Sequence, residues 1–295
     1  MAAERILAVG EILWDVFEDS ARLGGAPLNF AAHARRMGHD AIPLSAVGDD
    51  ELGRRARAEI EALGLSLRLT CTTPRYPTGA ASVQLDSQGH PAFRIHRPAA
   101  YDATEVSERD LAWLKAWNPG WLYFGSLMFT CGGALEMLGA IMDRLPGATR
   151  LYDVNLRPGS YTPALVADLM ARAHVIKLNE EELEPVARFG GLPYSDARAF
   201  AEAGAARYGW RTVCVTLGER GCGIWRGGEY VEAPGRSVAV VDTVGAGDAF
   251  TAALVHGLAR GDKLDAIASF ANRLGALIAG RAGAIPEWRM KELED

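Results

Sequence analysis

The 295-residue sequence lacks the features that mark several classes of protein. It contains only four cysteines and no Cys-x-x-Cys pair, so it indicates neither a disulfide framework nor a zinc cluster. No stretch approaches the roughly 18 consecutive apolar residues that a membrane-spanning helix needs. Residues 1–10 lead into an apolar strand and do not have the layout of a signal peptide. We therefore expect a cytoplasmic protein with reduced thiols and no membrane partner.

Basic residues are fewer than acidic residues in this sequence. The chain has 31 lysines and arginines against 37 acidic residues, which gives a net charge of −6. This balance argues against nucleic acid as a partner, although a local basic site is compatible with it. Internal repeats, low-complexity runs and linkers rich in proline or serine are absent from the sequence as well. We therefore expect one domain over residues 1–295, with any additional element inserted into it.

Two kinds of apolar pattern alternate along the chain. Strand-like runs occur at residues 6–9, 41–47, 121–124, 151–154, 175–178, 212–217, 222–225 and 230–232. Helical periodicity occurs at residues 29–37, 52–63, 134–145, 249–259 and 264–279. Strands that alternate with helices predict an α/β fold with a mainly parallel sheet covered on both faces. Apolar runs at 81–85 and 92–96 flank a polar turn at 86–90 and predict a small antiparallel element outside that sheet.

The most informative segment is residues 242–250, which read Asp-Thr-Val-Gly-Ala-Gly-Asp-Ala-Phe. Gly245 and Gly247 allow the backbone to approach a ligand closely. The helical pattern that follows leaves the N–H groups of Ala246, Gly247 and Asp248 among the first, unpaired donors, which attract phosphate oxygens. The helix dipole favours an ionised Asp248, which can take a proton from an acceptor. The segment predicts a phosphotransferase, although a glycine turn capped by Asp248 is about as common.

A second glycine-rich turn leads into a helix near the start of the chain. Gly24 and Gly25 allow close backbone approach, and Asn29 offers both a donor and an acceptor to hydroxyl groups. Asp15 follows the first strand and can accept hydrogen bonds from a polyol. An ordinary turn before a helix and a surface acid explain these residues about as well.

Polar residues follow three later strands. Strand alternation places Asp153, Asn155 and Arg157 on one side, at the carboxyl edge where open α/β sheets bind ligands. The planar fork of Arg157 suits a phosphate or sugar oxygen.

The acids after the strand at 175–178 can hold water-coordinated Mg²⁺, or form an acidic first helical turn. The small residues of Thr216–Gly221 can bind a nucleotide phosphate, or they form an ordinary turn that leads into a hairpin.

In this order, the motifs resemble those of PfkB-type carbohydrate kinases of the ribokinase superfamily. Residues 24–29 match the first signature of that family and residues 242–248 match its second, more specific one. The similarity runs from Gly10 to Ala284. The resemblance implies a three-layer α/β/α fold with a small β lid formed by about residues 20–23 and 69–97. It also implies ATP as the phosphoryl donor, Mg²⁺ and, as in many members, a bound K⁺.

The resemblance and the motifs together assign roles to individual residues. The expected catalytic group is Asp248, the anion hole of Gly245, Ala246 and Gly247, and Arg157. The expected sugar-binding residues are Asp15, Gly24, Gly25, Asn29, Asp153 and Asn155. The ATP site would use Asn179, Thr216, Gly218 and Asn272, while Glu182 would govern Mg²⁺. The monovalent cation would be held by Asp242, the Val244 carbonyl and a carbonyl near Gly283.

The choice of sugar depends on smaller differences. Ala26-Pro27 replaces the Lys-Gly of ribokinases, and this segment resembles fructokinases. Residues 11–15, 84–102 and 153–157 also resemble bacterial fructokinases, whereas Phe129-Thr130 departs from them. We expect fructose as the substrate, with 2-keto-3-deoxygluconate, another ketose or ribose as the alternative.

Two other classes of function compete with a kinase. A non-catalytic sugar or nucleotide sensor is disfavoured because Gly247 and Asp248 are intact. A NAD-dependent dehydrogenase is disfavoured because no Gly-x-Gly-x-x-Gly follows the first strand. A two-stranded ribbon is marginally stable alone, so we expect the lid to cover the sugar and to pair with a second chain in a homodimer.

Overall fold

The computed structural model describes residues 3–85 and 91–293. In this part of the chain a nine-stranded sheet runs in the order β13-β12-β11-β10-β9-β8-β1-β4-β5. Its strands are β1 (Arg5–Val9), β4 (Asp40–Gly48), β5 (Leu69–Thr73), β8 (Trp121–Phe124), β9 (Thr149–Asp153), β10 (Val175–Asn179), β11 (Thr212–Thr216), β12 (Cys222–Arg226) and β13 (Glu229–Ala233). Neighbouring strands from β5 to β11 are parallel, and β12 and β13 add antiparallel pairs at one edge. The expected α/β fold is confirmed.

Helices cover both faces of this sheet, which makes three layers. One layer contains α1 (Ala26–Arg36), α2 (Glu51–Ala62), α8 (Ala246–Arg260) and α9 (Leu264–Ala279). The other contains α3 (Glu108–Trp117), α4 (Ala134–Arg144), α5 (Pro163–Arg172), α6 (Glu180–Gly190) and α7 (Ala197–Tyr208). Within β1, Ile6 and Ala8 pack against the layer that contains α1 and α8, whereas Leu7 and Val9 pack against the layer that contains α3 to α7. This alternation explains why the strand is apolar throughout.

A second sheet contains β2 (Leu13–Val16), β3 (Ala21–Gly24), β6 (Gly79–Leu85) and β7 (Pro91–His96), in the order β3-β2-β6-β7. The expected hairpin is confirmed as β6 and β7, although its turn at 86–90 lies outside the described residues. Two expectations need correction. The sheet is mixed, because β2 pairs with β6 in parallel. Residues 69–73 form β5 of the large sheet, so the small sheet uses 79–96 and not all of 69–97.

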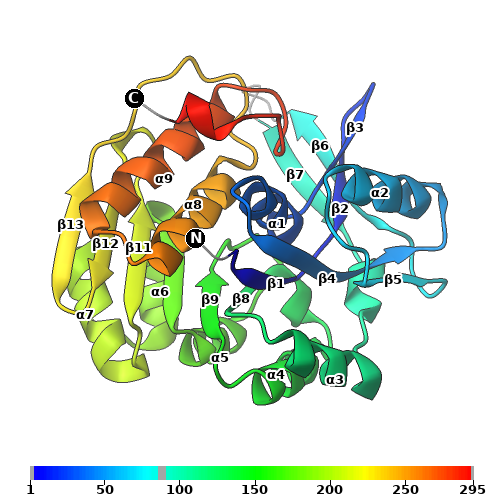
Figure 1. Ribbon diagram of the computed structural model, residues 1–295, viewed down its shortest axis with the longest axis horizontal. Coiled ribbons are helices and arrows are strands. Elements are labelled where there is room, and N and C mark those ends of the chain that lie inside the picture. Colours follow the sequence, from blue (N-terminus) through cyan, green and yellow to red (C-terminus); the bar gives the residue numbers. More distant parts are fainter. Residues whose placement is uncertain (1–2, 86–90, 294–295) are drawn as a thin grey trace.

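The chain order brings the small sheet next to the first turn of α1. Strands β2 and β3 lie between β1 and α1 in the sequence, so this sheet begins where β1 ends. Helices α1, α8 and α9 lie side by side (Figure 1). Both α1 and α8 begin three residues earlier than their apolar patterns predict, because each starts directly after a glycine with positive φ, Gly25 and Gly245. The motif residues 246–248 therefore form the first turn of α8.

The remaining short helices are Ala100–Ala103, Leu127–Thr130, Gly218–Arg220 and Met290–Glu292. None of the helices in the described part of the chain combines the length and the apolar character that crossing a bilayer demands.

Candidate active site

Asp248 lies at the meeting point of the first turns of α1 and α8. Its side chain is buried, and its Oδ2 accepts a hydrogen bond of 2.8 Å from the Asn29 amide. The Oδ1 of Asn29 is buried without a hydrogen-bond partner in the structure. A Cβ placed on Gly24 would lie 3.4 Å from Asp15 Oδ2 and 3.7 Å from Asn29 Oδ1. The structure thus brings Asp15, Gly24, Asn29 and Asp248 together, with one free acceptor among them.

The pKa of Asp248 is raised to about 6, chiefly by burial and then by the neighbouring Asp153 carboxylate. The Asn29 hydrogen bond and the charges of Lys177 and Arg157 lower it, but not enough to offset the burial. The sequence led us to expect the opposite direction, because the helix dipole favours the ionised form. The carboxyl group is still mostly ionised at neutral pH, and its pKa lies closer to neutrality than that of an ordinary aspartate. That is where a general base works best.

The anion-hole turn has the expected left-handed start, with φ of 80° at Gly245. The N–H of Ala246 donates a long hydrogen bond of 3.3 Å to the Thr243 carbonyl. Gly247 and Asp248, by contrast, have no backbone acceptor among the described residues. Two of the three expected donors are therefore open to a ligand.

Lys177 lies beside the anion-hole turn, and the sequence analysis did not single it out. Its Nζ lies 3.1 Å from Asp153 Oδ1, and a Cβ on Gly247 would lie 3.4 Å from the same Nζ. Burial lowers the pKa of Lys177, but carboxylates, Asp153 first, raise it above its ordinary value, so the ammonium stays charged beside the anion hole. The signal in the sequence was a lysine between Ile176 and Leu178 in a buried strand.

The contacts of Asp153 differ from those expected of a sugar-binding residue. It is fully buried, and its Oδ2 accepts a 2.9 Å hydrogen bond from Thr251 while Oδ1 pairs with Lys177. Both oxygens are engaged inside the protein, so Asp153 positions Lys177 and is not free to bind a sugar. Strand β9 ends at Asp153 and Asn155 has a φ of 42°, so the predicted alternation through Arg157 is wrong.

Arg157 still lies near the carboxylates of the site. Its side chain is exposed, and its charge lowers the pKa of Glu11, Asp15 and Asp248. Glu11 is a further residue that the sequence reasoning missed. It is buried, its Oε1 accepts a 3.2 Å bond from the Ala26 N–H, and burial raises its pKa to about 7.

Asn179 and Glu182 form a reciprocal helix cap at the start of α6. Asn179 Oδ1 accepts from the Glu182 N–H, and Glu182 Oε2 accepts from the Asn179 N–H. Glu182 Oε1 accepts a 2.6 Å bond from the Leu156 N–H. Because both carboxylate oxygens hold backbone groups, contact with Mg²⁺ would pass through water. Over residues 3–85 and 91–293 no cluster of three or more histidine, cysteine, aspartate or glutamate side chains could hold a metal.

The expected nucleotide residues lie at the carboxyl end of β11 and on α9. Thr216 Oγ1 donates a long 3.5 Å bond to the Leu178 carbonyl, and Gly218 has a φ of 61°. Asn272 donates to the carbonyls of Ala233 and Pro234, at 3.1 and 3.0 Å. Its amide therefore fixes the segment that follows β13.

The expected cation residues also come together. Asp242 Oδ1 accepts from the Val244 N–H at 3.1 Å, and Oδ2 accepts from the Gly283 N–H at 3.0 Å. The same Oδ2 is 3.0 Å from the Arg22 guanidinium. The carboxylate is thus already engaged by a positive charge.

The fold of this chain is ribokinase-like. The chain belongs to the pfkB family of carbohydrate kinases, whose family model matches residues 3–290, and it is a carbohydrate kinase. It is 30% identical to a fructokinase of Salmonella typhimurium over 300 residues, which cover 95% of each chain.

Two solved structures share the fold over nearly the whole length. A sugar kinase of Pyrococcus horikoshii, solved in complex with ATP, matches with a TM-score of 0.83 and 25% identity, covering 97% of this chain and 96% of that one. The 2-dehydro-3-deoxygluconokinase of Thermotoga maritima matches with a TM-score of 0.87 and 22% identity, covering 99% and 98%.

Proposed function

We propose that the protein transfers the γ-phosphoryl group of ATP to a hydroxyl group of fructose. One observation carries the proposal: a buried carboxylate, Asp248, shares a helical turn with open N–H donors, and the Lys177 ammonium lies beside that turn. A base and a cluster of positive groups at one point are what phosphoryl transfer to an alcohol requires. The ATP-bound sugar kinase of Pyrococcus horikoshii supports the choice of donor.

Each residue of the site has a separate role in the proposed reaction. Asp248 accepts the hydroxyl proton while the sugar oxygen forms a bond to the γ-phosphorus. The bond from that phosphorus to the bridging oxygen breaks, and ADP leaves with its electron pair. The N–H groups of Gly247 and Asp248, with Lys177, stabilise the charge on the transferring oxygens. Mg²⁺ bound to the ATP phosphates would add positive charge, with Glu182 in contact through water.

The sugar would lie against the first turn of α1 and strand β2. Asp15 and the free Oδ1 of Asn29 can accept hydrogen bonds from its hydroxyl groups, and Gly24 has no Cβ to occupy the space beside them. The fructokinase relative supports fructose. Arg157, exposed beside these carboxylates, favours a second candidate, the sugar acid 2-keto-3-deoxygluconate, because a guanidinium can pair with its carboxylate.

A screen of ATP consumption over a panel of sugars tests this function, followed by kcat/KM for fructose, ribose and 2-keto-3-deoxygluconate. We expect the highest value for fructose. A higher value for the sugar acid, with a loss in Arg157→Gln, would favour the second candidate. A protein that phosphorylates none of the panel would contradict the proposal.

We also propose that the small sheet covers the sugar and pairs with its counterpart in a homodimer. In this sheet Ala81 is buried, while Arg94 and His96 on the paired strand are exposed. A lid that excludes water would limit the loss of ATP to hydrolysis. Sedimentation at micromolar concentration tests the assembly, and a strict monomer would refute it.

A further inference from the structure

The carboxylate of Asp242 links three parts of the chain just before the anion hole. Its Oδ1 holds the N–H of Val244 in its own turn. Its Oδ2 holds the N–H of Gly283 in the C-terminal segment and the Nη1 of Arg22 in β3, both at 3.0 Å. Asp242 therefore fixes the start of the turn that ends in Gly245. The backbone of the C-terminal segment supports the same turn, since a Cβ on Gly245 would lie 2.5 Å from the Ala284 carbonyl oxygen.

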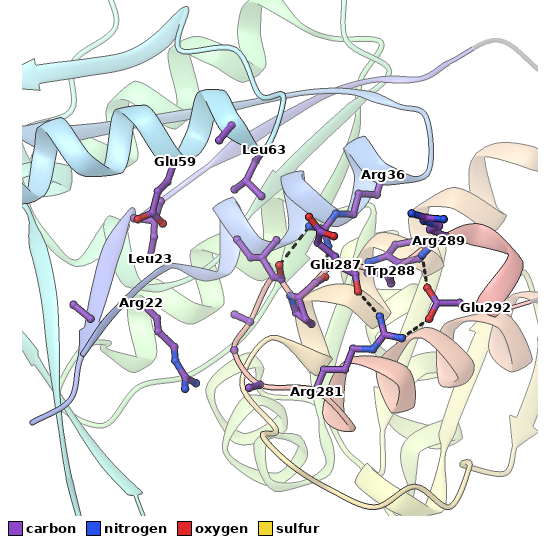
Figure 2. Close-up of a pocket in the computed structure, with 17 residues that line it drawn as sticks. Arg22, Leu23, Arg36, Glu59, Leu63, Arg281, Glu287, Trp288, Arg289 and Glu292 are labelled. Carbon is purple, nitrogen blue, oxygen red and sulfur yellow. Dashed lines mark hydrogen bonds and ion pairs between the residues drawn. The ribbon is translucent and has the colours of Figure 1, made fainter. Parts of the chain in front are cut away.

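Arg22 is fixed in place by more than its ion pair. Its guanidinium lies 5.2 Å from the centre of the Phe17 ring, and Arg22 stands opposite Asp15 in the β2–β3 ladder. A Cβ on Gly283 would lie 3.8 Å from Arg22 Cδ, so the apolar part of the side chain runs along the Gly283 backbone. Arg22 and residues of the C-terminal segment, including Arg281 and Trp288, line a cavity of about 850 Å³, and Figure 2 shows these side chains.

This arrangement does not fit the cation that the resemblance implies. A K⁺ ion held by Asp242 and by carbonyls near Val244 and Gly283 would lie next to the Arg22 guanidinium, a like charge. The carboxylate already has an ion pair and two N–H donors, and Arg22 covers the Gly283 backbone. Like charges at such a short distance repel strongly in a partly buried site.

We infer that the Arg22 guanidinium takes the place of a bound monovalent cation, and that the protein is active without K⁺. Arg22 is then a positioning residue: it neutralises Asp242 and holds the turn that carries the anion hole. It also joins the small sheet to that turn, so the element proposed to cover the sugar and the anion hole are linked by one side chain. The activity part of this inference rests on the proposed kinase function.

The test compares the wild type with Arg22→Gln in KCl and in tetramethylammonium chloride at matched ionic strength, with carry-over K⁺ excluded by analysis. We expect equal wild-type turnover in both salts. Without K⁺, Arg22→Gln should lose about tenfold in kcat, the range for one charged hydrogen bond, and K⁺ should restore much of it. Arg22→Lys should retain part of the activity without K⁺, because it keeps the charge.

A second measurement does not depend on catalysis. K⁺ should raise the unfolding temperature of Arg22→Gln in a concentration-dependent way, because it binds only the folded protein, and should not raise that of the wild type. Arg289→Gln is the matched control: Arg289 lines the same cavity without contacting Asp242, and its variant should behave as the wild type.

Three results would overturn the inference. K⁺ could activate the wild type severalfold or raise its unfolding temperature. K⁺ could leave both the turnover and the unfolding temperature of Arg22→Gln unchanged, or Arg289→Gln could depend on K⁺. If no sugar of the panel is phosphorylated, the proposed function fails, and the unfolding measurements still decide whether Arg22 replaces the cation.

Discussion

Replacing Asp248 with asparagine should abolish most activity and at the same time stabilise the protein. The amide has nearly the same shape and its oxygen can still accept the hydrogen bond from Asn29, which is 2.8 Å from the native carboxylate. It cannot take the proton of the sugar hydroxyl. Loss of a general base lowers turnover by about 10²- to 10⁴-fold. ATP affinity should change little, because the N–H donors of the turn remain.

The gain in stability follows from the pKa of Asp248, which is about 6 in the folded protein against an ordinary value of 3.8. At about 1.4 kcal/mol for each pKa unit, ionised Asp248 destabilises the folded state by about 3 kcal/mol at pH 7. Because the folded-state pKa is the higher one, this penalty is absent below about pH 4, grows as the pH rises towards 6 and is complete above that. The advantage of Asp248→Asn should follow the same course.

Steady-state kinetics and thermal unfolding at several pH values measure both effects. For a chain of this size we expect an unfolding temperature higher by about 5–10 °C at pH 7 and nearly unchanged at pH 4. Asp168→Asn on α5, a half-exposed aspartate paired with Arg172, is the control and should keep wild-type turnover. Wild-type turnover in Asp248→Asn would remove Asp248 from the role of base. An unfolding temperature that is not raised at pH 7 would refute the burial penalty.

Two further substitutions test the groups around Asp248. Lys177→Met leaves the buried Asp153 carboxylate without its positive partner. The free energy of unfolding in urea should then fall by about 3–5 kcal/mol, and kcat should fall with it. Exposed Lys115→Met should change neither quantity. Gly245→Ala places a Cβ 2.5 Å from the Ala284 carbonyl oxygen, so kcat should fall at least about tenfold as the anion hole shifts. Gly261→Ala, at the other end of α8, has a similar φ of 71° but open space around it, so only its stability should decrease; equal turnover in the two glycine variants would contradict this account.

The sequence was sufficient to predict the three layers and the position of Asp248. Apolar periodicity reports burial directly, so long helices such as α9 were predicted with their observed bounds. Strand β2 (Leu13–Val16) was missed, whereas β3 overlaps residues 20–23, which the family resemblance had placed in the lid. Strand β5 was assigned to the lid by the family resemblance; its burial does not alternate, since Leu69 and Thr70 are buried and the next two residues are exposed.

The site was predicted less completely because local sequence patterns do not reveal which side chains contact each other. Asp153 follows a strand, as a ligand-binding residue often does, and nothing near it in the sequence reveals Lys177 and Thr251 as its partners. The sequence predicts roles in ATP and Mg²⁺ binding for Asn179 and Glu182, and only the structure shows that the two residues cap the start of α6. Contacts between distant elements, such as Arg22 with Asp242, need the fold before they can be seen.

Three carboxyl groups with raised pKa values lie along the proposed sugar site: Glu11 at about 7, and Asp15 and Asp248 at about 6. Burial is the largest cause in each case, so all three have lost hydration that the protein does not fully replace. A polyhydroxyl ligand can replace it, because sugar hydroxyl groups donate hydrogen bonds to carboxylates. The same burial brings the pKa of the base towards neutrality, where proton transfer is efficient. The burial that raises these pKa values costs the folded protein stability, and it prepares the site both to bind a sugar and to accept its proton.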